Sequence, residues 1–399
     1  MARELQRRHQ LQPQQKPQPQ NQHPLRRTES PPPLFVVGGF CLPSEALVRY
    51  DILHMRLIPF RFVPKSFLGV DIGTSAIKVV ELQSWGKRKS LKNYGELQSS
   101  SLYDKPFRTF EKNTLMLSSK DIAKGMKGIL QESGIQTKQA VFSIPDFSSF
   151  FTHFSLPSMT KEELGEAVKF EARKHIPLPL SEVTIDWQIA QGRFDLKTPF
   201  QILLVAVPNE IINQYQEIAA LAELRLVALE AEVFGLVRSC LEATRNPIVL
   251  LDIGAQSTTV NVVVNNVLKI SHSTDIAGNN FTERVAQSLS VDKKSAQEQK
   301  HAQGMLSQDL AVILSPLVDM IGVEIEKISQ EFSQIEGKEV AGIVLAGGSS
   351  LLKGLREYFQ ANLKKPVDIA DPFRRIFYPA ILEPKIKELG VSYAVALGM

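Results

Sequence analysis

An Asp-Ile-Gly turn between two apolar segments occurs twice in this chain of 399 residues. The first copy, Asp71–Gly73, lies within FLGVDIGTSAIKVVEL, and the second, Asp252–Gly254, lies within IVLLDIGAQSTTVNVVV. The flanking residues alternate in polarity and are rich in Val and Ile, a pattern that predicts strands. The copies lie too far apart in the sequence for a solenoid repeat, so they favour a duplicated α/β domain.

A third glycine turn follows the apolar run GIVLA, at residues 347–349, and a pattern that predicts one helix continues over residues 349–363. In such turns glycine lets the backbone approach a bulky anion, and successive N–H groups point towards it. Lys78 would add a point charge for a phosphate. Asp71 and Asp252 repel phosphate, but they suit Mg²⁺ held through its water molecules. One turn alone is typical of a plain hairpin, whereas three together favour a phosphate-binding site.

Strands and helices alternate between the two Asp-Ile-Gly copies. Residues 119–135 predict a helix that ends at Gly134. Residues 160–176 predict another helix, which a capping box of Thr160 and Glu163 would begin. Neither the Walker sequence of P-loop proteins nor the G-x-G-x-x-G dinucleotide fingerprint occurs.

The charge of the chain is uneven. Residues 1–65 hold ten Lys and Arg against four Asp and Glu, whereas the remainder holds 36 against 38. The composition after residue 65 therefore gives no argument for nucleic acid as a partner. Residues 1–64 begin with a Gln- and Pro-rich stretch, and we expect them to be disordered or to be an extension from a start codon placed upstream of Met55.

Cysteine content and hydropathy bear on the compartment. Only Cys41 and Cys240 occur, which is too few for a disulfide framework and fits a reducing compartment, with Cys240 expected in a core. No apolar run approaches the roughly 18–20 residues of a membrane span. We therefore expect a cytoplasmic protein that reaches the membrane through partners.

The three turns, with the segment GIVLAGGSSLLKGL, resemble the actin/Hsp70/sugar-kinase superfamily, and the resemblance extends from Phe67 to the C-terminus. Within it, FLGVDIGTSAIKVVEL, EELGEAVKFEARKHIPLPLSEVTIDWQ and GVSYAVALGM are similar to the PilM family of type IV pilus assembly proteins. The second of these segments is the most discriminating, because other superfamily members lack it.

The resemblance implies an α/β, two-lobed actin-like ATPase fold, built from duplicated ribonuclease-H-like domains with a small inserted α+β subdomain as in the division protein FtsA. The expected boundaries are 65–141 and 209–246 for the first lobe, 142–208 for the inserted subdomain, 247–375 for the second lobe, and 376–399 for a C-terminal return to the first lobe.

The resemblance also implies ATP and Mg²⁺ as cofactors, with Asp71 and Asp252 holding the metal ion through water molecules. It names no catalytic residue. The predicted nucleotide site comprises Asp71, Gly73, Thr74, Ser75 and Lys78 at the first turn, Asp252, Gly254, Ser257 and Thr258 at the second, Gly347, Gly348 and Ser349 at the third, and Gly278, Asn279, Asn280, Glu324 and Lys327 nearby.

The implied function is that of a cytoplasmic ATP-binding scaffold of the type IV pilus inner-membrane assembly platform. Its implied partner is the cytosolic N-terminal peptide of a PilN-like membrane protein, bound between Val141–Pro145 and Lys161–Ile176. Other platform proteins and self-association are further expected contacts. ATP would set the angle between the lobes, with slow or absent hydrolysis. A metabolite kinase and an FtsA-like filament-forming division protein are the alternatives.

Four further features favour ordinary structural roles. Glu230 and Glu232 are expected to be charges at a helix N-terminus rather than groups beside a catalytic water. Residues 293–301, rich in Lys and Gln, predict a solvated helix face. Trp187 is expected to pack rather than to stack on a base.

Overall fold

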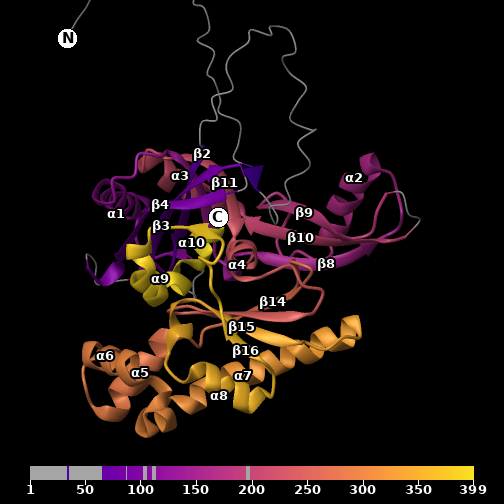
Figure 1. The fold of residues 1–399 in the computed structure, drawn as a ribbon. Coiled ribbons are helices and arrows are strands. Elements are labelled where there is room, and N and C mark those ends of the chain that lie inside the picture. The colour runs from indigo at the N-terminus through magenta and orange to yellow at the C-terminus, as the bar shows by residue number, and fades with distance from the viewer. Residues whose placement is uncertain (1–33, 36–64, 87, 102–105, 110–113, 195–197) are drawn as a thin grey trace, which may run out of the picture. The chain divides into compact units, whose positions relative to one another are not determined.

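Two large mixed sheets organise the described residues of this computed structural model, which are 34–35, 65–86, 88–101, 106–109, 114–194 and 198–399 (Figure 1). All of them belong to one compact unit, residues 33–399. The expectations for residues 1–64 therefore lie outside the described residues, apart from the two-residue strand β1 (Leu34–Phe35).

The first sheet has an antiparallel meander at one side and parallel strands at the other. Besides β1 it contains β2 (Lys65–Ile72), β3 (Ala76–Trp85), β4 (Arg88–Gln98), β7 (Gln139–Ile144), β11 (Arg225–Ala231) and β17 (Ile376–Phe377). The strand order is β1-β11-β7-β2-β3-β4-β17. Strands β2, β3 and β4 are antiparallel neighbours, while β7 is parallel to β2 and β11 is parallel to β7.

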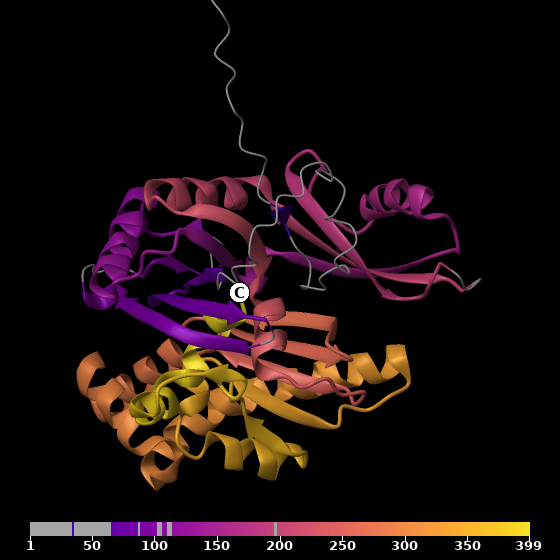
Figure 2. The same ribbon diagram turned by 45° about the horizontal axis from the view of Figure 1, so that its top comes forward.

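Helices cover both faces of this sheet (Figure 2). Helices α1 (Ser119–Glu132) and α3 (Asn209–Leu221) lie on one face, and α4 (Glu232–Cys240) and α10 (Ala394–Gly398) lie on the other. Leu68, Val70 and Ile72 of β2 are fully buried in the core, and burial of each contributes roughly 1.5–3 kcal/mol. Because alternate strand residues face opposite sides, Gly69 and Asp71 face α10 and α4 instead.

The second sheet repeats the arrangement of the first. It contains β12 (Ile248–Ile253), β13 (Thr258–Val264), β14 (Val267–Thr274), β15 (Gly342–Ala346) and β16 (Val367–Ile369), in the order β14-β13-β12-β15-β16. The order of β4-β3-β2-β7-β11 is the same, with an antiparallel meander followed by two parallel strands. The duplication predicted from the two Asp-Ile-Gly turns is therefore confirmed.

Four helices pack with the second sheet: α5 (Gly278–Leu289), α6 (Lys293–Gln303), α7 (Gln308–Glu336) and α8 (Leu355–Leu363). The single helix predicted over residues 349–363 is wrong, because a 3-10 turn, η4 (Gly348–Leu351), is followed by a break before α8 begins. Gly354 has a φ of 81°, a left-handed conformation that a continuous helix excludes. No single helix among the described residues is long and apolar enough to cross a membrane. Two consecutive helical segments, Lys293–Leu306 and Gln308–Glu336, together have the length and apolar composition of a membrane span, but the chain bends sharply between them.

A smaller sheet inserted between β7 and α3 carries its own hydrophobic core (Figure 1). It consists of β8 (Phe150–Leu156), β10 (Phe200–Pro208) and β9 (Val183–Gln191), with α2 (Lys161–Ala172) against it. The predicted capping box of Thr160 and Glu163 is confirmed, but α2 ends at Ala172, earlier than expected. Trp187 packs against this core, as predicted.

The residues after the second sheet return to the first one. Beyond β17, these are η5 (Ala380–Leu382), α9 (Glu383–Leu389), η6 (Gly390–Tyr393) and α10. The approach of α10 depends on glycines, since a Cβ at Gly69 would overlap the carbonyl oxygen of Ala396 and a Cβ at Gly398 would overlap the backbone of Gly235. Close backbone contact thus joins α10 to both β2 and α4.

Candidate functional site

The first Asp-Ile-Gly turn joins β2 to β3, as predicted. The Gly73 N–H donates to the Ala76 carbonyl at 2.9 Å and closes the turn. Asp71 is buried, and its Oδ1 accepts a hydrogen bond of 2.9 Å from the Ser143 hydroxyl at the end of β7. The carbonyl oxygen of Thr74 accepts the N–H of Phe107 at 3.0 Å, and that of Ser75 is similarly bonded to Ser99.

The second turn has the same hydrogen-bond closure. The Gly254 N–H donates to the Ser257 carbonyl at 2.9 Å. The Thr258 hydroxyl donates to the Ile276 carbonyl at 2.6 Å, so this side chain links the turn to the segment before α5. The two copies are therefore equivalent in backbone geometry as well as in sequence.

The start of α5 and the third turn both lie against the second turn. The Gly278 N–H donates to the Gly254 carbonyl at 3.1 Å, and the Asn279 N–H donates to the Ala255 carbonyl at 2.7 Å. The Ser349 hydroxyl also donates to the Gly254 carbonyl, at 2.7 Å. The second turn, the start of α5 and the third turn are distant in sequence, and they are joined at Gly254.

Glycine at the third turn is required by Asp252. Gly347 has a φ of 80°, and a Cβ there would overlap the Oδ1 of Asp252. A Cβ on the neighbouring Gly348 would lie 3.6 Å from the Cβ of Ser392 in the C-terminal segment. Lys78 donates to the carbonyl of that same Ser392 at 2.8 Å, so this predicted phosphate-binding cation is bonded to η6 in the protein alone.

The carboxylate of the first hairpin turn acts on the carboxylate of the second. Burial and the negative charge of Asp71 raise the pKa of Asp252 to about 6, and the positive charge of Lys78 opposes the rise. Coulombic effects of this kind require charges that lie close together. The two turns, one from each large sheet, are therefore neighbours in space.

A buried arginine, Arg108, stands beside these turns and was not singled out from the sequence. It lies in a short hairpin of β5 (Arg108–Thr109) and β6 (Thr114–Leu115) and is 3% exposed. Its Nη1 donates to the Tyr215 hydroxyl at 3.1 Å, and its Nη2 donates to the Glu232 carboxylate at 3.2 Å. Burial raises the pKa of Glu232 well above its usual range, while Arg108 counteracts that rise.

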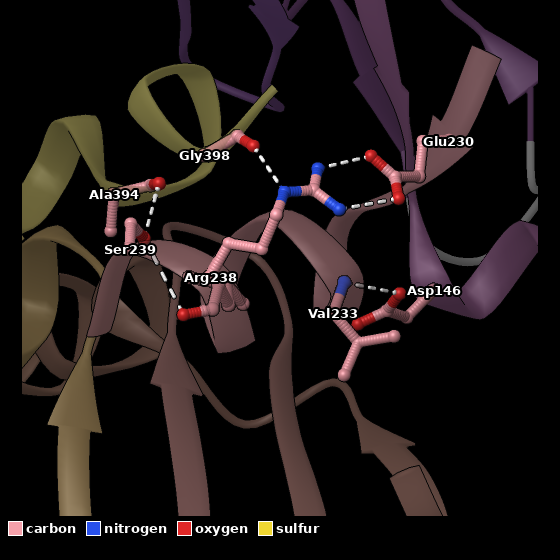
Figure 3. Close-up of polar contacts among 8 residues, drawn as sticks. Asp146, Glu230, Val233, Arg238, Ser239, Ala394 and Gly398 are labelled. Carbon is pink, nitrogen blue, oxygen red and sulfur yellow. Dashed lines mark hydrogen bonds and ion pairs between the residues drawn. The ribbon is translucent and has the colours of Figure 1, made fainter. Parts of the chain in front are cut away.

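Glu232 lies in the first turn of α4, as expected, although it is also paired with the buried Arg108. The expectation for Glu230 is wrong, because this residue belongs to β11. Figure 3 shows that Glu230, near the end of β11, is paired through both carboxylate oxygens with Arg238 of α4, one bond being 2.7 Å. Arg238 also donates from Nε to the Gly398 carbonyl at 2.8 Å, and Ser239 donates to the Ala394 carbonyl at 2.7 Å. These contacts join α4 to α10.

Asp146 is a further buried acid near Arg108 and Glu232. It lies in η2 (Asp146–Ser148), and its Oδ1 accepts the backbone N–H of Val233 at 3.0 Å (Figure 3). Burial raises the pKa of Asp146 to about 8, and the charge of Asp252 adds to the rise. Sequence reasoning had no signal for this residue, because its partners come from distant segments.

Lys300 of α6 also belongs to this region, so the prediction of a solvated face over residues 293–301 is wrong at this position. It is 6% exposed and donates to the Gly278 carbonyl at 2.9 Å and to the Thr282 hydroxyl at 2.7 Å. Burial lowers the pKa of Lys300 to about 8. A signal was present, since Lys300 follows the apolar Ala296 by one helical turn and shares its buried face.

Glu324 and Lys327, the least firmly aligned of the predicted residues, have other contacts. On α7 the Glu324 carboxylate faces the His272 Nδ1 at 2.8 Å and the Lys327 Nζ at 3.3 Å. Within the described residues, no hydrogen bond or ion pair connects either of them with the three turns. Asn280, by contrast, accepts the Ala277 N–H at 2.9 Å and shapes the start of α5.

Asp71 and Asp252, the acids of the two hairpin turns, suit a divalent cation bound through water. Burial favours the protonated forms of the neighbouring Asp146 and Glu232, so these two acids add little to the negative charge of the site. Among the described residues, no three His, Cys, Asp or Glu side chains are grouped closely enough to hold a metal ion by themselves. Bound water or the oxygens of a phosphate ligand would have to complete the coordination of such an ion.

Two sheets of equal topology, with a pair of acidic hairpin turns facing each other, define a two-lobed actin-like fold. The family described as type IV pilus assembly protein PilM matches residues 69–399. The chain belongs to this family of type IV pilus assembly proteins.

The chain is also similar to individual known proteins. The structure of a PilM–PilN type IV pilus biogenesis complex is 24% identical, with a TM-score of 0.72, over 83% of this chain and 96% of that one. The cell division protein FtsA of Streptococcus pneumoniae serotype 2 (strain D39 / NCTC 7466) is 22% identical over 74% of this chain and 73% of its own length. MreB5 of Spiroplasma citri bound to ADP has a TM-score of 0.47 at 13% identity, over 84% and 94% of the two chains.

Proposed function

We propose that this protein is an ATP-binding scaffold of the type IV pilus inner-membrane assembly platform. The convergence of the α5 N-terminus and the third turn on Gly254, opposite Asp71, carries the proposal. In it, ATP lies between the two large sheets, with its phosphates at the two hairpin turns and its adenosine near Gly347 and Gly278. Mg²⁺ would offset the excess negative charge of Asp71 and Asp252.

In this proposal Lys78 exchanges its bond with the Ser392 carbonyl for a phosphate oxygen. An ammonium group can make this exchange because its four-carbon stem is flexible. Thr74, Ser75, Ser257 and Thr258 supply hydroxyl donors around the phosphates. Binding of the nucleotide would then release the C-terminal segment from its bond with Lys78.

The proposed partner is the cytosolic N-terminal peptide of a PilN-like membrane protein, and the similarity to the PilM–PilN complex supports it. The peptide would lie between Val141–Pro145 and Lys161–Ile176, that is, beside β7 and α2. Through this partner the protein would be cytoplasmic and peripheral at the inner membrane. We also propose the domain boundaries expected from the sequence, with residues 142–208 as the inserted subdomain beside which the peptide binds.

Binding of a fluorescent ATP analogue in the presence of Mg²⁺ tests the nucleotide site. Asp71→Ala should weaken binding about tenfold or more, since it removes a carboxylate beside the metal ion. Asp368→Ala, at an exposed position of β16, is the matched control and should bind normally. Unchanged affinity of a folded Asp71→Ala protein would refute the assignment of the first turn.

A further inference from the structure

The hairpin between β3 and β4 presents an aromatic side chain and cations at one end of the first sheet. Trp85, the last residue of β3, is 61% exposed. Arg88 begins β4 and is the cross-strand partner of Trp85, so the two side chains lie on the same face of the sheet. In the turn between them, a Cβ on Gly86 would meet nothing within 4 Å. This end of the hairpin is therefore open to solvent.

A second exposed aromatic residue lies on the same face. Phe377 of β17 is 71% exposed and is paired with Ser90 of β4, which in turn is paired with Gln83 of β3. Since side chains alternate along a strand, Phe377 shares its face with Arg88 and Trp85. Phe377 and Trp85 are separated by the width of two strand spacings, about 10 Å. Large exposed apolar side chains that gather in this way mark an interaction surface.

The cations beside Trp85 are not neutralised. Lys65, Arg88 and Lys89 are all exposed, and the register places Lys65 opposite Ser84 and Ser84 opposite Lys89. Within the part of the chain that the structure describes, none of these three cations has an ion-pair partner. Glu81, the acid of β3, is fully buried and already bonded within the first sheet. The hairpin end of the sheet is thus positively charged.

The segment around β17 is closer to neutral. Arg374 and Arg375 face the Glu242 carboxylate at 2.9 and 3.6 Å, and Lys387 faces the Glu383 carboxylate at 3.1 Å. The unpaired positive charge is consequently concentrated on the side of the hairpin, next to the indole ring.

We propose that this end of the first sheet, with Trp85, Phe377, Lys65, Arg88 and Lys89, contacts the surface of an anionic lipid bilayer. Aromatic rings are favoured at the boundary between headgroups and acyl chains. Each Lys or Arg near an anionic membrane strengthens binding about fivefold. The choice of a bilayer rests on the inner-membrane location in the proposed function, whereas the contact itself needs neither ATP nor the peptide.

Sedimentation of the full-length protein with lipid vesicles, without nucleotide or peptide, tests this contact. Vesicles of equal parts phosphatidylglycerol and phosphatidylcholine should bind the protein, and phosphatidylcholine alone should bind it at least about tenfold less. About 0.5 M NaCl should release it, because salt screens exposed charges. Trp85→Ser should weaken binding about tenfold, because the ring no longer leaves water. Ile335→Ser, at a similarly exposed position of α7, should bind like the wild type.

A charge variant separates this surface from the total charge of the protein. Arg88→Gln combined with Lys89→Gln should weaken binding at least about tenfold. Lys124→Gln combined with Lys294→Gln removes the same charge from exposed positions of α1 and α6, and it should change binding less than about threefold. Equal losses in the two double variants would contradict a contact at the hairpin.

Fluorescence reports whether the hairpin itself enters the bilayer. The chain has two tryptophans, Trp85 and Trp187, so Trp187→Phe leaves Trp85 as the only one that emits. Its emission should shift to shorter wavelength on the mixed vesicles and be quenched by brominated lipid. Failure to bind the mixed vesicles, unchanged binding of Trp85→Ser, or unshifted Trp85 emission would overturn the proposal in favour of a protein partner at this surface. None of these outcomes alters the nucleotide test of the proposed function.

Discussion

Asp252 is a residue whose charged form is destabilised by the fold. Its pKa is raised to about 6, above the ordinary aspartate value of 3.8, because it is buried near Asp71. The raised pKa means that the folded protein favours the protonated acid. This contribution is favourable at low pH and is lost as the pH rises through the folded pKa.

We therefore predict that the nucleotide-free protein loses stability between about pH 4 and pH 7, by on the order of 1–3 kcal/mol from this residue. Asp252→Asn should flatten that dependence, and Mg²⁺ should restore part of the lost stability in the wild type. Urea unfolding at several pH values measures the effect, with Asp368→Asn as control. A wild-type profile as flat as that of Asp252→Asn would contradict the expected cost of burying this charge.

Lys300 gives a second prediction at the same scale. Its ammonium group lies on the Gly278 carbonyl and the Thr282 hydroxyl, at the start of α5. Lys300→Met keeps most of the side-chain volume but removes these bonds, and it should weaken nucleotide binding about tenfold. Lys294→Met on the exposed part of the same helix is the matched control. Equal losses of nucleotide affinity in both variants would show that the total positive charge of α6 matters, rather than the position of Lys300.

At the scale of elements, α4 connects η2 with the C-terminal helix α10. Its first turn meets Asp146 through the Val233 N–H, and its last turn meets α10 through Arg238 and Ser239 (Figure 3). A displacement of η2 would therefore be passed along α4 to the C-terminal segment. The glycine contact between Gly235 and Gly398 fixes how closely the two helices approach.

We predict that Gly398→Ala destabilises the protein by about 1–3 kcal/mol, because the new Cβ would overlap the backbone of Gly235. Gly128→Ala is the matched control: in the middle of α1 a Cβ there meets nothing within 4 Å. It should stabilise the protein by about 0.5–1 kcal/mol through helix propensity. Thermal unfolding compares the two, and a neutral Gly398→Ala would show that α10 can move away without cost.

Elements with local sequence signals were the ones that could be predicted. The hairpin turns at Asp71 and Asp252, and the capping box at Thr160, depend on residues a few positions apart. The partners of Glu230 and Glu232, Arg238 and Arg108, could not be predicted because they are recognisable only once the chain has folded. The break before α8 could not be predicted, because a single glycine also occurs inside helices and only the left-handed backbone of Gly354 marks the break.

At the scale of the molecule, the two large sheets meet at acidic turns that repel each other in the absence of a cation. We predict that Mg²⁺–ATP stabilises both lobes together, by about 2.7 kcal/mol at a ligand concentration one hundred times the dissociation constant. Calorimetry should show the whole unfolding transition moving to higher temperature. If only part of it moves, the nucleotide contacts one lobe and the proposed bridging is wrong. The same experiment with ADP in place of ATP measures how much of the stabilisation comes from the terminal phosphate.

The return of the last residues to the first sheet has a consequence for synthesis. Strand β17 pairs with β4, and α10 packs on β2 and α4, although the entire second sheet lies between them in the chain. A nascent chain can form the second lobe while the first still lacks part of its surface. The ribosome must therefore have synthesised and released residues 376–399 before the lobe that was translated first can be completed.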